Sequence, residues 1–322
     1  NGPCAVAVDL ENSHRLPKEI AQDVIWGSVR SVDHALRTAR VETRDGEVTV
    51  RYRKLILAQG AAPWIPDVPG VLAGEGSSGP TVMVGDRLLP RDALAPNVKV
   101  LRGLQDAKDL DQMAKSAKRA VVVGSGAIGL EVAEALHQRG LSVTVVEVLP
   151  HAVAALDEDM AAVLENKLLQ NGIDLKVGLT VSEVLRDGIL LSDGSKLEAE
   201  LVVFASGVRP RLDLARSLGL KVDRGVVVDG RMMTSLEDVY AVGDMAQLTD
   251  AATGLPLLPL IGTLAMRQAM VAAMNVAGMP AQLPPVTTWG VSQVFDLHWG
   301  SVGWTVEAAR RCGVEAVGVR IP

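Results

Sequence analysis

Short runs of apolar residues recur along the chain, and most of them end in glycine or in small polar residues. Residues 121–123 are three valines, a β-branched run typical of a parallel strand that is buried on both faces. Apolar residues at helical spacing follow over 128–136, Arg139-Gly140 ends the helix, and residues 141–146 form a second apolar strand. The pattern predicts a strand-helix-strand unit within residues 119–148.

Three more apolar strands run into small-residue turns, at Gln59-Gly60, Ser206-Gly207 and Gly243-Asp244. Small residues at the carboxyl end of a buried strand allow a large ligand to come close. The turns at Gly60 and Gly207 both lie near a proline, and one domain inserted into another would produce this repetition.

The remaining elements follow from the same periodicities. An Asp45-Gly46 turn predicts a hairpin over residues 41–52. Helices are predicted at 104–117, 157–171, 263–277 and 306–311. Further strands are predicted at 4–8, 24–33, 173–177, 181–185, 188–191, 226–228, 287–295, 299–304 and 314–319, and a hairpin at 81–89. The segment from 284 is too small for its own core, so we expect it to pack on the rest of the protein or on a partner.

Composition narrows the function classes. At 322 residues the chain is long enough for two or three domains, and its net charge of −6 argues against nucleic-acid binding. Residues 254–279 are mostly apolar, but Arg267 and two prolines make them too interrupted to span a bilayer. The histidines show no paired ligand spacing, so we expect no metal site.

The two cysteines, Cys4 and Cys312, lie almost the full chain apart, without a paired cysteine motif or a secretory segment. We therefore expect a protein of the reducing cytoplasm, with Cys312 at the surface. The chain begins at Asn1, and we expect a processed, cut or incomplete molecule.

The link between the first strand and the helix consists of Gly124, Ser125, Gly126, Ala127, Ile128 and Gly129, a GxGxxG sequence. Gly124 allows the tight turn, Gly126 lets a pyrophosphate approach the backbone, and Gly129 lets the helix pack closely on the strand. The phosphates would meet free N–H groups at the amino end of the helix, where the helix dipole favours negative charge.

Glu147 ends the second strand, 18 residues after Gly129. A carboxylate at this position accepts hydrogen bonds from both ribose hydroxyls of NADH and repels the 2′-phosphate of NADPH. Val148-Leu149-Pro150 supplies no cation to relieve that repulsion, so the sequence favours NADH. The alternative, a buried unit that binds nothing, stays open.

From about residue 24 to the end, the chain resembles the pyridine nucleotide-disulfide oxidoreductase family, in the branch of NADH oxidases, NADH peroxidases and coenzyme A-disulfide reductases. The motifs that carry the resemblance are GSVRSVD (27–33), KLILAQGAAP (54–63), VVVGSGAIGLEVAEAL (121–136), VVEVLP (145–150), VFASGVRP (203–210), TSLEDVYAVGDMAQL (234–248) and LAMRQAMVAAMNVAG (264–278).

The resemblance implies an α/β fold with two Rossmann-like domains of the glutathione reductase type, in which an NADH domain is inserted into an FAD-type domain. The start of an α+β dimerisation domain follows. The implied limits are 1–99 for the first part of the FAD-type domain, 100–225 for the NAD(H)-binding domain, 226–283 for the return to the FAD-type domain and 284–322 for the start of the C-terminal dimerisation domain.

The resemblance also implies flavin contacts. Ala58 and Gly60 resemble the family's small-residue flavin turn, and Val29 resembles the backbone contact to the flavin adenine. Asp244 resembles the carboxylate that binds the ribityl chain, with Gly243 giving it room. Without the resemblance, each of these turns is ordinary.

Further implied residues lie near the reacting rings. Leu264 and Ala265 resemble the helix start whose N–H groups face the flavin ring and stabilise negative charge there. Glu131 matches the family glutamate near the flavin and the nicotinamide, and Gly207 is expected beside the nicotinamide.

Three features depart from the family pattern. Residues 1–50 contain no GxGxxG, the sequence with which the family holds the flavin pyrophosphate. The branch often carries a redox cysteine before glycine, but Cys4 precedes Ala5, so Cys4 is either redox-active or an inert apolar residue. The dimerisation domain also ends early, and a core fragment of a longer enzyme would show all three departures.

We therefore expect an FAD-dependent NADH oxidoreductase that passes hydride from NADH to flavin and on to oxygen, peroxide, a disulfide or another acceptor. Two alternatives stay open: a non-catalytic NADH-binding module that has lost flavin, and a ferredoxin or rubredoxin reductase-like electron-transfer flavoprotein. The expected partners are a small-molecule or protein electron acceptor and, if the C-terminal domain is complete, a second copy in a homodimer. No nucleic acid and no membrane span are expected.

Overall fold

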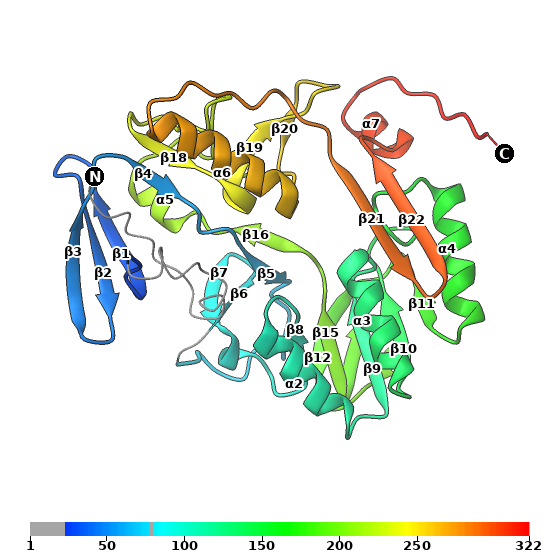
Figure 1. Cartoon of the computed structure of the whole chain (residues 1–322). Coiled ribbons are helices and arrows are strands. Elements are labelled where there is room, and N and C mark those ends of the chain that lie inside the picture. The colour runs from blue at the N-terminus through cyan, green and yellow to red at the C-terminus, as the bar shows by residue number, and fades with distance from the viewer. Residues whose placement is uncertain (1–22, 78–79, 322) are drawn as a thin grey trace. The chain divides into compact units, whose positions relative to one another are not determined.

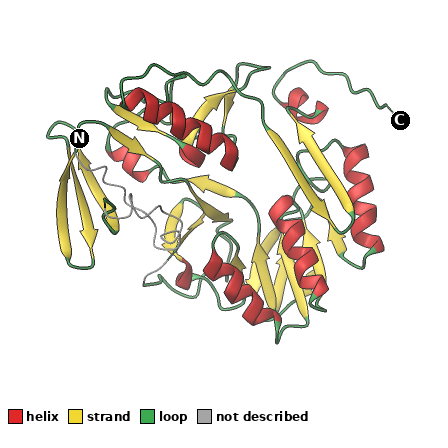
Figure 2. Ribbon diagram, viewed as in Figure 1, coloured by secondary structure: helices red, strands yellow, loops and turns green. Residues whose placement is uncertain are grey.

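The computed structural model describes residues 23–77 and 80–321 (Figures 1 and 2). By its contacts the chain divides into two units: the first comprises Asn1–Ala61 and Pro210–Val286, and the second comprises Ala62–Arg209 and Thr287–Pro322. The strand predicted at 4–8, and Cys4 with it, lie outside the described residues. The limits implied by the family resemblance are those of cofactor-binding domains, whereas these two units are defined by contacts within the chain. The implied domain limits therefore stay a prediction.

A five-stranded parallel sheet forms the centre of the second unit. Its spatial order is β11–β10–β9–β15–β8. The strands are β8 (Val98–Val100), β9 (Arg119–Val123), β10 (Ser142–Val146), β11 (Asp174–Lys176) and β15 (Leu201–Phe204). The inner strands β9, β10 and β15 are short and mostly apolar, as expected where both faces of a parallel sheet are covered, whereas the edge strand β11 has only one apolar residue.

Alternate residues of these strands enter two different cores. Val122 packs with α2 (Leu104–Ala114), α3 (Ala127–Gln138) and α4 (Glu158–Gln170) in one core. Val121 packs on the opposite side, with strands of two small sheets. The valine run is therefore buried on both faces, which confirms the expectation for residues 121–123.

Two small sheets contain local hairpins, and one of them also pairs strands that lie far apart in the sequence. One has the order β12–β13–β14 and the other β16–β5–β6–β7. Their strands are β12 (Val181–Leu185), β13 (Gly188–Leu191), β14 (Lys196–Glu198), β5 (Ala61–Ile65), β6 (Thr81–Val84), β7 (Arg87–Pro90) and β16 (Val208–Pro210). The hairpins predicted at 181–191 and 81–89 are thus confirmed.

The end of the chain packs on the helical layer of the second unit. β21 (Trp289–Val294) and β22 (Leu297–Val302) form an antiparallel hairpin, and α7 (Val306–Arg311) follows. Val294 is fully buried in the same core as α3 and α4, and the Phe295 N–H donates to Glu134 Oε2 at 2.8 Å. The expectation that this segment packs on the rest of the protein is confirmed.

The strand predicted at 314–319 is wrong. Within the described chain no strand pairs with these residues, and the side chains of Val317 and Val319 are more than four-fifths exposed. An alternating pattern forms a strand only where a neighbour accepts its backbone hydrogen bonds.

The first unit is built around the parallel pair β4 (Leu55–Leu57) and β18 (Val239–Ala241), with Leu57 opposite Ala241. β18 is buried throughout, because one core lies on each of its faces. The other elements are β1 (Gly27–Asp33), β2 (Thr38–Thr43), β3 (Gly46–Arg51), α5 (Asp213–Ser217), β17 (Val226–Val227), β19 (Ala246–Thr249), β20 (Pro256–Leu257) and α6 (Gly262–Val276). None of the described helices is long and apolar enough to cross a membrane.

The packing of α4 yields a stability prediction. Leu164 is 1% exposed against the parallel sheet, whereas Leu169 on the same helix is 54% exposed. Leu164→Ala removes buried methyl groups and leaves a cavity, so we expect the free energy of unfolding, measured in urea, to fall by about 2–5 kcal/mol. Leu169→Ala is the matched control, with an expected change within about 0.5 kcal/mol. Equal losses in the two variants would show that this face of α4 is not the packed one.

Candidate functional site

The glycine turn of the second unit lies where β9 ends against β15. Gly124 has φ +107°, and its N–H donates to Val146 O at 2.8 Å. A Cβ atom on Gly124 would lie 2.5 Å from the carbonyl oxygen of Ala205, directly after β15. Only glycine therefore fits, for reasons of both conformation and space.

The other two glycines of the motif have opposite surroundings. A Cβ on Gly129 would lie 2.0 Å from Gly124 O, so α3 packs against the turn backbone to backbone. A Cβ on Gly126 would meet nothing within 4 Å. Gly126 is the N-cap of α3 and has no side chain to cap it, and the first turn contains no acidic residue. The first N–H groups of α3 are thus available to an anion in open space.

The strand order of the sheet reverses beside this turn. The chain passes from β9 through α3 to β10 on one side, while β15 lies on the other side of β9. Gly207 follows β15 with φ +100° and open space around its Cα, and Gly207 O accepts the Trp64 N–H at 2.9 Å. Ligands of open α/β sheets bind at such reversals, outside the carboxyl ends of the strands.

Glu147 comes directly after β10 and is only 8% exposed. Its Oε2 accepts the N–H and the hydroxyl of Ser125 at 2.8 and 2.7 Å, and its Oε1 accepts the Leu149 N–H at 3.0 Å. A carboxylate has about four acceptor positions, so these three donors fix its orientation and leave little spare capacity. The sequence placed Ser125 in the turn but gave no sign that it holds Glu147.

Glu131 is exposed on α3, and its Oε1 accepts the hydroxyl of Ser292 from β21 at 3.0 Å. Ala127 and Ile128 form the first residues of α3, and Ile128 is 45% exposed. The structure therefore brings Gly124 to Gly129, Glu147 and Gly207 together at one edge of the sheet, with Glu131 further along α3.

In the first unit, three segments that lie far apart in the sequence converge. Because β4 and β18 are parallel and in register, Ala58 to Gly60 and Gly243-Asp244 leave the sheet at the same edge. The Gln59 N–H lies 3.2 Å from the sulfur of Met245, in the short 3-10 helix Gly243–Met245. Neither Gly60 nor Gly243 has a close atom where a Cβ would be, apart from Ala265 Cβ at 4.0 Å from that of Gly243.

The start of α6 meets the same edge. The Gly243 N–H donates to Oε1 of Gln268, which is 1% exposed, at 2.6 Å. Leu264 is buried in the core and Ala265 is half-buried. The N-cap Ile261 offers no side-chain hydrogen bond and the first turn has no acidic residue, so this helix end also suits negative charge.

Val29 is the one predicted flavin residue outside this group of turns. It sits at a bulge in β1, and its side chain packs in the core that contains Leu57 and Ala241. Cys312 is exposed at the end of α7, as expected. No group of His, Cys, Asp and Glu side chains within the described residues has the arrangement of a metal site.

The parallel sheet, its reversal point and the glycine turn define a protein of the Rossmann-like α/β class. The family model for pyridine nucleotide-disulphide oxidoreductases matches residues 6–275, so the chain belongs to this family. The predicted family and fold class are confirmed.

Three known proteins illustrate the likeness. An NADH oxidase of Methanocaldococcus jannaschii is 32% identical over 290 residues, and the match covers 88% of this chain and 60% of that protein. The structure of an NAD-dependent persulfide reductase from A. fulgidus has a TM-score of 0.82 at 29% identity, covering 92% of this chain and 52% of that one. A water-forming NADH oxidase from Lactobacillus brevis bound to NADH has a TM-score of 0.79 at 26% identity, covering 92% and 64%. The chain thus spans about 60% of the length of its curated relative.

The two contrasting glycines give a prediction. In Gly129→Ala the new methyl group meets the Gly124 carbonyl, so α3 has to move off the turn, and we expect a loss of about 2 kcal/mol or more in urea unfolding. Gly126→Ala enters open space and is expected to cost within about 1 kcal/mol, because alanine is only a poorer N-cap. Equal unfolding midpoints for the two variants would contradict the close packing at Gly129.

Proposed function

We propose that the chain is the core of an NADH-dependent flavoprotein oxidoreductase. The observation that carries this proposal is the convergence, in the first unit, of the turns after β4 and β18 with the start of α6. Such a set of small-residue turns and an uncapped helix end has no evident use in a protein that binds only a nucleotide in its other unit.

On the nucleotide side, the pyrophosphate of NADH would meet the N–H groups of Gly126, Ala127 and Ile128 at the start of α3. Glu147 would accept hydrogen bonds from the ribose hydroxyls. Three donors occupy three of about four acceptor positions of this carboxylate, and the remaining position would accept a ribose hydroxyl. NADH is preferred to NADPH because no cation follows Glu147 in Val148-Leu149-Pro150.

On the flavin side, the residues present fit the group. Gly60 and Gly243 leave space at the sheet edge, Asp244 offers a carboxylate for hydroxyl groups, and the N–H groups of Leu264 and Ala265 suit negative charge. Bound FAD would supply the acceptor for hydride from NADH. Val29 as the adenine contact, and Gly207 and Glu131 as neighbours of the nicotinamide, remain predictions.

For the electron acceptor we propose a chemical class rather than a particular compound. The relatives named above include NADH oxidases and a persulfide reductase, which favours oxygen or a sulfur compound over other acceptors. We also keep the homodimer as a proposal.

The principal alternative is a non-catalytic NADH-binding module. The observation in its favour is that residues 1–50 contain no second GxGxxG sequence for a flavin pyrophosphate. A ferredoxin reductase-like flavoprotein shares the other motifs. It would be distinguished by its ability to reduce a protein acceptor and by an activity that thiol alkylation does not change.

The flavin proposal predicts a visible spectrum. After incubation with excess FAD and removal of free cofactor, we expect a retained oxidised-flavin band that bleaches when NADH is added without oxygen. Asp244→Asn is expected to weaken FAD binding about tenfold, because it removes a charged acceptor. Asp223→Asn, on an exposed turn, is the control and should retain flavin like the unsubstituted chain. NADH binding without flavin retention would favour the non-catalytic module.

The nucleotide proposal predicts a change of cofactor preference. In Glu147→Arg the ribose acceptor is replaced by a cation that suits a 2′-phosphate, so the Kd for NADH should rise about tenfold or more and that for NADPH should fall. Leu169→Arg adds the same charge on the exposed face of α4 and keeps the carboxylate, so it should still prefer NADH. Unchanged preference in folded Glu147→Arg would remove Glu147 from the ribose site.

A further inference from the structure

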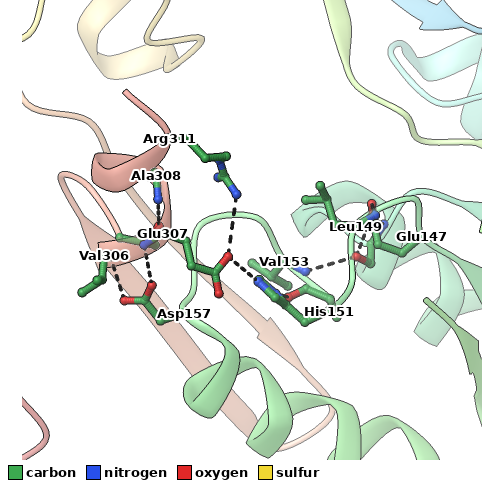
Figure 3. Close-up of polar contacts among 12 residues, drawn as sticks. Glu147, Leu149, His151, Val153, Asp157, Val306, Glu307, Ala308 and Arg311 are labelled. Atoms are coloured by element: carbon green, nitrogen blue, oxygen red, sulfur yellow. Dashed lines mark hydrogen bonds and ion pairs between the residues drawn. The ribbon is translucent and has the colours of Figure 1, made fainter. Parts of the chain in front are cut away.

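The loop of residues 148–157, between β10 and α4, holds the carboxylate of Glu147, the proposed ribose acceptor, from two sides. Its Leu149 N–H donates to Glu147 Oε1 at 3.0 Å. Its Val153 N–H donates to Ser125 Oγ at 3.1 Å, and Ser125 in turn donates to Glu147 Oε2 (Figure 3). The position of Glu147 and of the glycine turn therefore depends on the conformation of this loop.

That conformation is strained at one point. Val153 has φ +57°, in the left-handed region that β-branched residues rarely adopt, and its side chain is 2% exposed. Such a conformation persists only where surrounding contacts hold it. The Ala152 N–H, which donates to Glu165 Oε1 of α4 at 2.7 Å, is one such contact.

Further contacts come from α7, about 150 residues further along the chain. Asp157 accepts the N–H groups of Val306 and Glu307, both at 3.1 Å, at the first turn of that helix. His151 reaches the same helix with its Nε2 3.1 Å from Glu307 Oε2, and its Nδ1 lies 3.0 Å from Ala152 O. The loop is thus joined to α7 at His151 and Asp157 (Figure 3).

Both ring nitrogens of His151 face oxygen atoms that only accept hydrogen bonds. Both contacts are therefore hydrogen bonds only when both nitrogens carry a proton and the ring is an imidazolium. A neutral ring keeps one of them and turns a lone pair toward the other oxygen. After proton loss, Glu307 still has Arg311, whose Nη1 lies 3.7 Å from the same carboxylate oxygen.

The charged groups around His151 favour its protonated form. The favouring charges are the carboxylates of Glu307 from α7 and Glu165 from α4. Arg311 lies beyond Glu307 and acts in the opposite direction, and Asp157 lies at the helix start. Burial is the largest influence and lowers the pKa of His151, but the Ala152 carbonyl and the two glutamates outweigh it and raise the pKa above 6.5. A raised folded-state pKa means that the contact is complete below pH 6.5 and is lost as the pH rises through the folded value.

We propose that protonated His151 is a positioning residue for NADH: it holds the loop of residues 148–157 on α7 and thereby keeps Ser125 and Glu147 in place for the ribose. This inference rests on the proposed function, because it takes NADH as the ligand of Glu147. Loss of the proton loosens the loop, so part of the binding free energy is spent on ordering it again.

The test is the pH dependence of the Kd for NADH, measured by titration calorimetry on the full chain. Between about pH 6 and about pH 8.5 we expect the Kd of the unsubstituted chain to rise about fivefold, as one charge-assisted hydrogen bond is lost. His151→Gln removes the titrating ring, so its Kd should stay nearly constant at the weaker value. Glu307→Gln replaces the carboxylate by an amide that can donate an N–H to the neutral ring, so its Kd should also change little with pH. His298→Gln, an exposed histidine on β22, is the control and should follow the unsubstituted chain.

The outcomes separate this inference from the proposed function. If the unsubstituted chain and His298→Gln bind no NADH at any pH, both are overturned. If NADH binds and His151→Gln keeps the pH dependence of the unsubstituted chain, only the role of His151 is overturned. Should His151→Gln fail to fold, the same comparison is made with Glu307→Gln, whose amide can donate an N–H to the neutral ring.

Discussion

The second unit of the molecule depends on the backbone contact between Gly129 of α3 and the turn at Gly124. With no Cβ on either residue, the helix packs against the ends of β9 and β15, and its amino end faces the point where the strand order reverses. The same approach brings Ser125 within hydrogen-bonding distance of Glu147 at the end of the neighbouring strand. The direction of the amino end of α3, the open space at Gly126 and the position of Glu147 therefore all depend on this one close approach.

The first unit reaches a comparable arrangement through strand register rather than through one glycine contact. Leu57 pairs with Ala241, although about 180 residues separate them in the sequence, and this pairing aligns the turns at Gly60 and Gly243. The buried amide of Gln268 then fixes α6 against the second turn. A slip of the register by one residue would separate the turns, so the candidate flavin site depends on the packing of β18 between its two cores.

The sequence predicted most of what is local. Apolar periodicity located α2, α4 and α6 to within a few residues, and the Asp-Gly turns located the hairpins at 41–52 and 181–191, because these patterns act over short distances. It missed β5, β8 and β16, which are strands only because a distant segment pairs with them, and it gave residues 314–319 a strand without a partner. The GxGxxG motif and Glu147 were found, but the hydrogen bonds of Ser125, His151 and Asp157 join distant segments and leave no periodic signal.

The segment after residue 287 contacts the rest of the second unit at two places beside the candidate nucleotide site. Near the start of α3, Ser292 donates to Glu131, and one turn further on Glu134 accepts the Phe295 N–H. At the second place, beside Glu147, Asp157 and His151 of the loop of residues 148–157 contact the start of α7. A short segment without a core of its own thus packs on α3 and on the loop at the same time. The contacts that hold this segment in place also hold residues of the candidate nucleotide site. A change that loosens the contact on α3 or the contact on the loop is therefore expected to loosen the other contact as well.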